Sequence, residues 1–206
     1  MAIDASTTDE VLLIRLSAGD EAAFEALYDR RQPAIYRYAL RMCGSEPIAE
    51  DVTQDVFMAL MRDAAKFDGS KGTVGGYLFG VARHRVLRHL QRGKSFVPMN
   101  DALDDDARAD SANVDTAADP LEALARTRTI ESVRQAVLSL PLHYREVVVL
   151  CSLEEMNYAE AAEALGCAIG TVRSRLHRAR EMLVERLDAV RVDGQVPART
   201  PAVRGT

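Results

Sequence analysis

The chain has 206 residues, of which 48% are hydrophobic and 28% charged, and its formal net charge is −5. This is the composition of an ordinary folded protein, and the length allows one large domain or two small ones. There is no apolar run of membrane-spanning length and no N-terminal secretory signal, so we expect no membrane insertion and a cytoplasmic location. The three cysteines are widely spaced and the four histidines lack ligand spacing, so the sequence predicts no disulfide framework and no metal site.

The first half of the chain has the apolar periodicity of four helices, which we expect over residues 9–16, 21–42, 46–64 and 74–91. Gly19 should end the first helix, and Asp20 should cap the second. Pro33 lies inside the second helix and should kink or divide it, because proline removes one backbone hydrogen bond. Gly44 should end that helix, and Pro47 suits the first turn of the next one.

The second half also reads as helices, expected over residues 121–140, 142–153 and 158–165 and from about 168 to beyond 181. The first of these has an apolar face that includes Ile130, Val133, Val137 and Leu140. No segment has the alternation of a strand. The sequence therefore predicts an all-α fold with two small helical domains.

Charge is sorted into blocks along the chain. Residues 83–94 contain five Lys or Arg, two His and no acid, whereas residues 101–119 contain seven Asp and a single basic residue. The low hydrophobicity and like charge of the second block predict a flexible acidic linker over residues 96–120. Such a linker is either an inert tether or a segment that lies in a basic channel of a partner. Residues 191–206 are rich in Pro, Arg and Gly, and we expect a disordered tail there.

Two helices of the C-terminal domain form the pattern of a helix-turn-helix. Asn157 should cap the first helix and Gly166 should end it, because Gly adopts the left-handed conformation at little cost. Val172, Leu176, Ala179 and Leu183 then line one face of the second helix.

The opposite face of that second helix has the composition of a DNA-reading surface. Residues 170–180 contain four arginines and no acid. Arginine bonds guanine edges in pairs and also holds phosphates, while Ser and His provide adaptable polar contacts. An amphipathic helix with a solvated basic face is the alternative, and the preceding helix and glycine turn favour the helix-turn-helix.

The order of the motifs resembles one bacterial family. The stretch SLPLHYREVVVLCSLEEMNYAEAAEALGCAIGTVRSRLHRAREML resembles region 4 of the extracytoplasmic-function (ECF) sigma factors, in the sigma-70 superfamily. Upstream, AEDVTQDVFMALMR and GYLFGVARHRVLRHL resemble region 2 of the same family, in the same order. The resemblance implies a region 2 domain over residues 8–95 and a region 4 domain over residues 121–190.

For region 2, the resemblance implies two surfaces. One docks on the β′ clamp of core RNA polymerase, and its residues here are Asp51, Gln54, Asp55 and Phe57. The other recognises and melts the downstream (−10) promoter element, with Lys71, Tyr77, Arg83, His84, Arg85 and Arg88 as its residues. Tyr77 and Phe79 also have the spacing of core residues. The family usually has Trp at position 77 and Asn at position 84, so this chain departs from it at both.

For region 4, the resemblance implies contacts with the upstream (−35) element from Arg173, Ser174, His177 and Arg178. Thr171 and Arg175 match positions that contact phosphates. The family often has Pro where this chain has Ala168.

The function implied by the resemblance is that of a promoter-specificity subunit, which is not an enzyme and needs no cofactor. Its expected partners are core RNA polymerase, through the β′ clamp and β flap, promoter DNA, and an anti-sigma factor. The family's linker threads towards the active-site cleft of the polymerase.

A free-standing regulator with an unrelated N-terminal module is the alternative function. An enzyme is a third possibility, but the sequence has no catalytic carboxylate pair, nucleophile motif or phosphate loop.

Overall fold

The structure is a computed structural model that describes residues 3–4, 6–95 and 120–193, although the side chains of 71, 93–95, 120–125 and 189–193 are outside that description. The N-terminal part contains α1 (Asp9–Ser17), α2 (Glu21–Cys43), α3 (Glu46–Asp63), two 3₁₀ turns, η1 (Ala64–Lys66) and η2 (Gly69–Lys71), and α4 (Val74–Ser95). The C-terminal part contains α5 (Pro120–Leu138), α6 (Leu142–Val148), the π-helical η3 (Val149–Leu153), α7 (Tyr158–Leu165) and α8 (Ile169–Asp193). Every regular element in these ranges is helical, which confirms the all-α, two-domain prediction.

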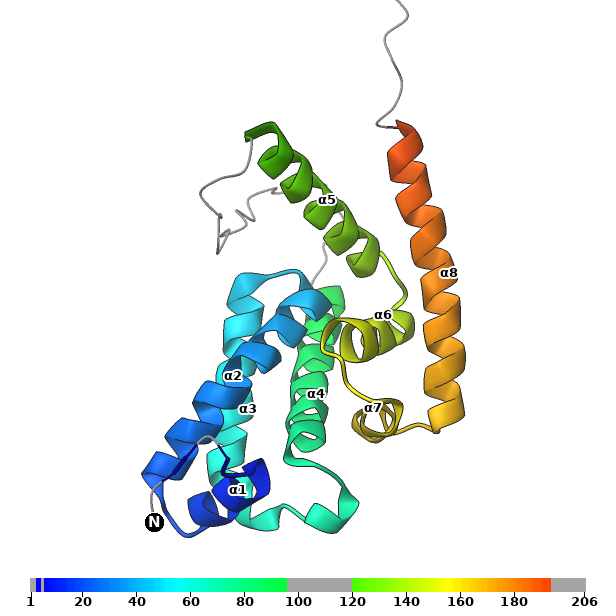
Figure 1. Cartoon of the computed structure of the whole chain (residues 1–206). Helices are drawn as coiled ribbons and strands as arrows, with labels where there is room; N and C mark the ends of the chain where they lie inside the picture. Colours follow the sequence, from blue (N-terminus) through cyan, green and yellow to red (C-terminus); the bar gives the residue numbers. More distant parts are fainter. Residues whose placement is uncertain (1–2, 5, 96–119, 194–206) are drawn as a thin grey trace, which may run out of the picture.

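Helices α1 to α4 form the N-terminal domain (Figure 1), and their buried apolar residues belong to a core cluster that continues into the C-terminal helices. Local capping explains where these helices begin and end. The Asp20 carboxylate accepts from the backbone N–H groups of Ala22 and Ala23, and Gly44 ends α2 in the left-handed conformation. The fully buried core side chains include Leu27, Tyr38, Val52, Leu60 and Leu78.

Pro33 does not divide α2, so that part of the prediction is wrong. The helix continues from Glu21 to Cys43 with the proline inside it. Pro33 is exposed, and on the solvent side of a helix the carbonyl that loses its backbone donor can bond water instead. One missing hydrogen bond is therefore tolerated, because the apolar face of α2 still packs on α3.

A buried carboxylate attaches α1 to this domain. Asp9 is the first residue of α1 and its side chain is almost fully buried. It accepts from Arg30 at 2.7 Å and from Arg31, both on α2. A buried charge needs such partners to offset its lost hydration, so these two arginines fix where α1 lies.

Helices α5 to α8 form the C-terminal domain, in which α7 and α8 are the predicted helix-turn-helix (Figure 1). The Asn157 side chain accepts from the backbone of Ala159 and Glu160, and Gly166 is left-handed, as expected. Val172, Leu176 and Ala179 are buried on α8, and Leu183 is half-buried.

The predicted apolar face of α5 is only partly correct. Val137 and Leu140 are buried, but Ile130 is 69% exposed and Val133 is also exposed. Figure 1 shows why, since only the end of α5 nearest α6 reaches the other helices. The earlier turns of α5 extend beyond the packed part of the domain.

The segment expected to be one helix over 142–153 changes its hydrogen-bonding pattern at Val149. There α6 gives way to the five-residue π-helix η3. The chain then turns through Glu155, a non-glycine residue with a φ of 55°. Such turns and π-helices cost energy and are found disproportionately at functional sites.

The expected linker over 96–120 falls almost entirely outside the described residues, as does most of the expected tail over 191–206. Helix α8 extends to Asp193, so its helical part includes the first three residues of that expected tail. Within the described ranges, no helix is long and apolar enough to cross a membrane.

Replacing Asn157 by Ala should lower the free energy of unfolding by about 1 kcal/mol, because two backbone donors at the start of α7 lose their acceptor. Chemical denaturation measures the change. Ser45→Ala is the matched control, since Ser45 occupies the N-cap of α3 without making a side-chain cap bond. Equal losses in both variants would contradict this account of the cap.

Candidate nucleic-acid and polymerase interfaces

The expected upstream DNA contacts form an exposed basic face on α8. Arg173, Ser174, His177 and Arg178 are exposed, and Thr171 and Arg175 are half-buried beside them. The buried apolar residues of α8 pack against the rest of the domain, so the basic face of the helix points to solvent. All six expected residues therefore lie along one helix at the surface of the C-terminal domain.

Weak local contacts order this face. Arg178 and His177 lie 3.1 Å and 3.4 Å from the Glu181 carboxylate, and the Arg173 guanidinium lies 5.8 Å from the centre of the Tyr158 ring. Exposed contacts of this kind are worth little individually, so these side chains can exchange them for DNA at small cost.

The residues expected to contact the downstream element lie on α4, except Lys71, whose side chain is outside the described set. Val74, Leu78, Ala82 and Val86 bury one face of α4. The opposite face is basic, and on it His84 and Arg88 are exposed while Arg83 and Arg85 are half-buried.

The two aromatic residues of α4 have different environments. Phe79 is buried and meets Tyr38 edge-on, with ring centres 5.4 Å apart, so it is a core residue. Tyr77 is half-buried and meets Phe67 edge-on at 5.7 Å, and burial raises the pKa of its hydroxyl. Tyr77 also lines a hollow of about 430 Å³ beside His84, Arg85 and Glu163. Of these two rings, only that of Tyr77 is partly exposed.

The expected clamp-facing residues share α3. Asp51 and Gln54 are exposed, and Asp55 is paired with Arg85 of α4 at 3.4 Å. Phe57 is only 3% exposed, and its ring lies 4.7 Å from that of Tyr28. Phe57 is therefore a packing residue beneath the α3 face, and it is not an exposed contact residue.

A groove of about 530 Å³ runs beside these residues between α2 and α3. Its exposed apolar lining includes Tyr28, Met58 and Met61, which sequence reasoning did not single out. The sequence could have indicated this apolar surface, because Met58 and Met61 lie three residues apart on α3 and outside its buried stripe.

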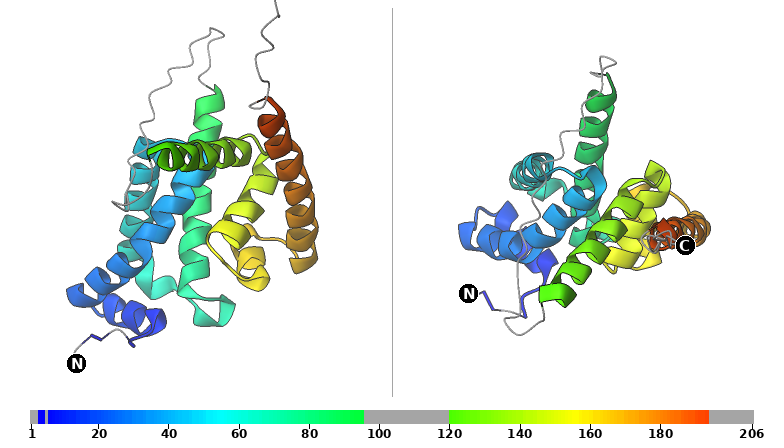
Figure 2. Two further views of the ribbon diagram at one scale, coloured as in Figure 1. Left: turned by 45° about the horizontal axis from the view of Figure 1, so that its top comes forward. Right: turned by 90° about the horizontal axis from the view of Figure 1, so that it is seen from above.

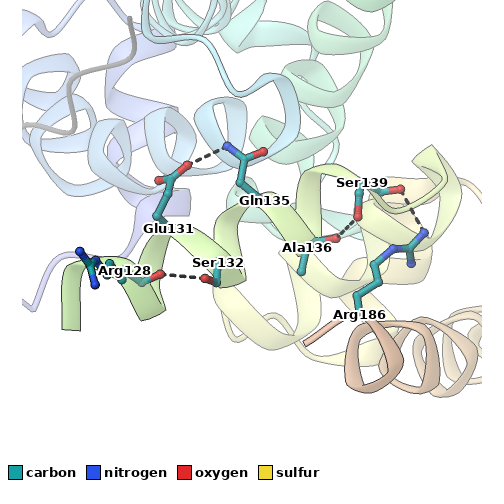
Figure 3. A pocket seen from close by; sticks show the side chains of 7 residues that line it. All are labelled: Arg128, Glu131, Ser132, Gln135, Ala136, Ser139 and Arg186. Carbon is teal, nitrogen blue, oxygen red and sulfur yellow. Dashed lines mark hydrogen bonds between the residues drawn. The ribbon is translucent and has the colours of Figure 1, made fainter. Parts of the chain in front are cut away.

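A second groove, of about 790 Å³, separates α5 from α8 (Figure 3). Arg186 of α8 reaches the Ser139 carbonyl at 3.4 Å, and Gln135 donates to Glu131 at 2.7 Å along α5. The groove is lined by Arg128, Glu131, Ser132, Gln135, Ala136, Ser139 and Arg186.

In the ranges described, these surfaces have no metal-binding cluster beside them. Searched over these residues, the chain has no group of three or more His, Cys, Asp or Glu that could hold a metal ion. Cys43, Cys151 and Cys167 are free and half-buried, and burial raises the pKa of the Cys43 thiol to about 11. A thiol with that pKa is unreactive at neutral pH.

A helix-turn-helix with an outward basic helix, joined to a second helical domain with its own basic helix, defines a DNA-binding protein with two candidate reading surfaces. Family comparison identifies the domains. Residues 27–96 match the sigma-70 region 2 model and residues 130–183 match a sigma-70 region 4 model. The chain belongs to the sigma-70 family of RNA polymerase sigma factors, in its ECF group.

Individual relatives agree with this assignment. The ECF RNA polymerase sigma factor SigE of Mycolicibacterium smegmatis is 31% identical over 81% of this chain, and the match spans 63% of SigE. The RNA polymerase sigma-H factor of Pseudomonas aeruginosa is 30% identical over 85% of this chain and 91% of its own length. Among solved structures, CnrH in complex with the cytosolic domain of CnrY is 27% identical with a TM-score of 0.66, covering 88% of this chain and 97% of CnrH. Sigma factors are promoter-specificity subunits of RNA polymerase, not enzymes.

Proposed function

We propose that this chain directs core RNA polymerase to promoters by reading two elements and melting the downstream one. The observation that carries the proposal is the exposed basic face of α8 in a chain whose two domains match sigma regions 2 and 4. The domain limits we propose are residues 8–95 and 121–190, with residues 96–120 as the linker. Since transcription takes place in the bacterial cytoplasm, the protein works there.

Region 4 reads the upstream element with α8 in the major groove. Arg173, Ser174, His177 and Arg178 contact bases, and Thr171 and Arg175 contact phosphates. This division is supported by exposure, because the first four side chains are exposed and the other two are half-buried. Half-buried side chains are better placed to hold the backbone at the edge of the groove.

Region 2 receives the melted downstream strand on α4. Arg83, Arg85, Arg88 and Lys71 attract phosphates, and Tyr77 and His84 meet an unstacked base at the hollow they line. Stacking on an aromatic ring and a basic track for the backbone are the two features that single-strand binding requires.

The polymerase contacts use both domains. Asp51, Gln54 and Asp55 on α3, supported by Phe57, meet basic residues of the β′ clamp, and the apolar groove beside them adds buried area. We place the β flap at the groove between α5 and α8 in Figure 3, where Ile130 and Val133 leave apolar surface exposed nearby.

An anti-sigma factor is the expected regulator. Members of the family are usually held inactive by one, and the similar protein CnrH was solved in complex with the cytosolic domain of another protein. Such a partner would cover the polymerase-binding surfaces of this chain.

Co-migration with core polymerase separates this function from that of a free-standing regulator. The purified chain should form a stable complex with core RNA polymerase on size exclusion. A regulator would bind duplex DNA by itself and ignore core polymerase, so a chain with that behaviour would refute the proposal.

His84→Ala should leave binding to the duplex promoter nearly unchanged and reduce open-complex formation. Neutral histidine offers one donor and one acceptor, and its ring can stack on an unpaired base. His84→Asn should keep activity, because the amide also offers a donor and an acceptor. Permanganate footprinting of the melted strand, set beside duplex binding, measures both steps.

His89→Ala is the matched control on the same helix and should melt like wild type. Equal melting by wild type and His84→Ala would identify His84 as an ordinary surface histidine. The base would then have to be captured in the loop over residues 67–73.

A further inference from the structure

The basic face of α8 continues into acidic residues, to which sequence reasoning gave no role. Residues 170–180 contain four arginines and no acid, whereas residues 181–193 contain four acids and two arginines. Arg178, Glu181 and Glu185 are exposed and follow one another at spacings of three and four, so they lie on one stripe of the helix. The stripe proposed to read bases therefore ends at the Glu181 carboxylate.

Glu181 contacts two of the residues proposed to read bases. Its Oε2 accepts a hydrogen bond from Nη1 of Arg178 at 3.1 Å, and its Oε1 lies 3.4 Å from Nε2 of His177. The hydrogen bond to Glu181 is the largest cause of the raised pKa of the Arg178 guanidinium, followed by the charge of Glu181. One carboxylate thus orients two neighbouring reading side chains through its two oxygens.

The position of α8 leaves this stripe open to DNA. Figures 1 and 2 show α8 along the edge of the molecule opposite α2 and α3, with α6 and α7 on its inner side. The buried residues Val172, Leu176 and Ala179 pack on the inner side, where α8 contacts α5, α6 and α7. A duplex that approaches from the outer side meets the exposed stripe of α8 first.

The bond between Arg178 and Glu181 is compatible with reading a guanine. It uses one terminal nitrogen of a planar guanidinium that has five N–H donors. The edge formed by Nε and the second terminal nitrogen can still donate in parallel to O6 and N7 of guanine. Arg178 therefore does not have to leave Glu181 in order to contact a base.

The same bond opposes a contact with phosphate. An Arg178 side chain that turns to a phosphate gives up Glu181 and leaves the carboxylate facing the negatively charged backbone of the DNA. Glu185 lies one turn further along the exposed stripe and adds to the negative field around Arg178. The pairing is thus unfavourable for phosphate contacts and neutral for contacts with guanine.

We infer that Glu181 is a positioning residue that raises the specificity of upstream reading, because it holds Arg178 and His177 for base edges and away from phosphates. The inference rests on the proposed function, since it needs α8 to enter the major groove. Glu181 gains no attraction to DNA of its own. It contributes to discrimination by weakening the binding of sequences that offer Arg178 only a phosphate.

The expected size of the effect follows from counterion release. One phosphate contact adds about 0.9 to the slope of log K against log salt concentration, and it is worth roughly fivefold in affinity at about 0.15 M salt. Freeing Arg178 from Glu181 should therefore strengthen non-specific binding by about this factor.

Glu181→Gln tests the inference, because it removes the charge, keeps the shape and lies at an exposed position where folding should not suffer. The wild-type full chain first enriches sequences from a fluorescein-labelled duplex library randomised over the upstream element. The variant should bind the unselected library about fivefold more tightly, with a salt slope steeper by about one unit. Its affinity for the enriched sequences should change by less than about twofold, so discrimination falls.

Glu185→Gln is the matched control, since it makes the same charge change one turn further along the stripe, whereas the bond to Arg178 comes from Glu181. It should change affinity for the unselected library by less than about twofold. Glu181→Asp keeps the charge and should retain most of the wild-type discrimination. In an Arg178→Ala background, Glu181→Gln should steepen the salt dependence far less, because the side chain that it releases is absent.

Equal discrimination by the wild type and Glu181→Gln overturns the inference. Equal effects of Glu181→Gln and Glu185→Gln also overturn it, because they would assign the change to net charge. Both results leave upstream reading by α8 intact. A wild-type chain that enriches no sequence from the library instead refutes upstream reading itself, and the inference falls with it.

Discussion

Reversing Asp51 and Asp55 to lysine weakens binding to core RNA polymerase by about two orders of magnitude, close to 3 kcal/mol, on this account. Both carboxylates lie on the α3 face proposed to meet basic residues of the β′ clamp. Lysines at these positions remove two attractive pairs and add repulsion. Domain folding should survive, because Asp51 is exposed and Asp55 makes only a 3.4 Å surface pair with Arg85.

The measurement is a competition for core polymerase against the wild-type chain, with circular dichroism as the folding check. Glu25→Lys/Asp29→Lys is the matched control, because it makes the same charge change at the same spacing on an exposed part of α2. Unchanged core affinity in the Asp51/Asp55 variant would remove the clamp assignment from α3. An equal loss in the control would mean that overall charge, and not this face, governs binding.

Arg178→Ala should cost about 1–3 kcal/mol at the preferred upstream element and relax specificity there, because it removes a paired contact to a base edge. The Arg178 side chain is exposed and makes a surface ion pair with Glu181, so its loss should not disturb the fold. Arg175→Ala should weaken binding to all promoters more evenly. Its salt dependence should also be less steep, because one phosphate contact fewer releases fewer counterions.

Binding of both variants to a library of upstream sequences, repeated at two salt concentrations, separates the two roles. Matching sequence profiles for the two variants would refute the division between base and phosphate contacts.

Local signals in the sequence explain the parts of the fold that could be predicted. Asp20, Gly44, Asn157 and Gly166 act on backbone groups within a few residues of themselves, and each begins or ends a helix where expected. The buried face of α8 follows from helical periodicity alone. Pro33 misled the prediction because the cost of one lost hydrogen bond was weighed without the packing of the whole helix.

The packing of the two domains against each other could not be predicted, because it depends on contacts between residues far apart in the chain. Arg41 and Glu154 are 113 positions apart, and Arg83 and Glu146 are 63 apart. Nothing in the sequence near Glu154 distinguishes it from a solvated surface acid. The exposed Ile130 and Val133 were misjudged for a related reason, since periodicity marks an apolar face without saying whether another element covers it.

Promoter-specific initiation in a purified system tests the central claim most directly. Core RNA polymerase is combined with the full chain on genomic DNA, and the 5′ ends of the transcripts are mapped. The account predicts discrete start sites that share two upstream sequence elements and disappear when the chain is omitted. Initiation that is unchanged by adding the chain, under conditions where the chain is folded, would contradict it.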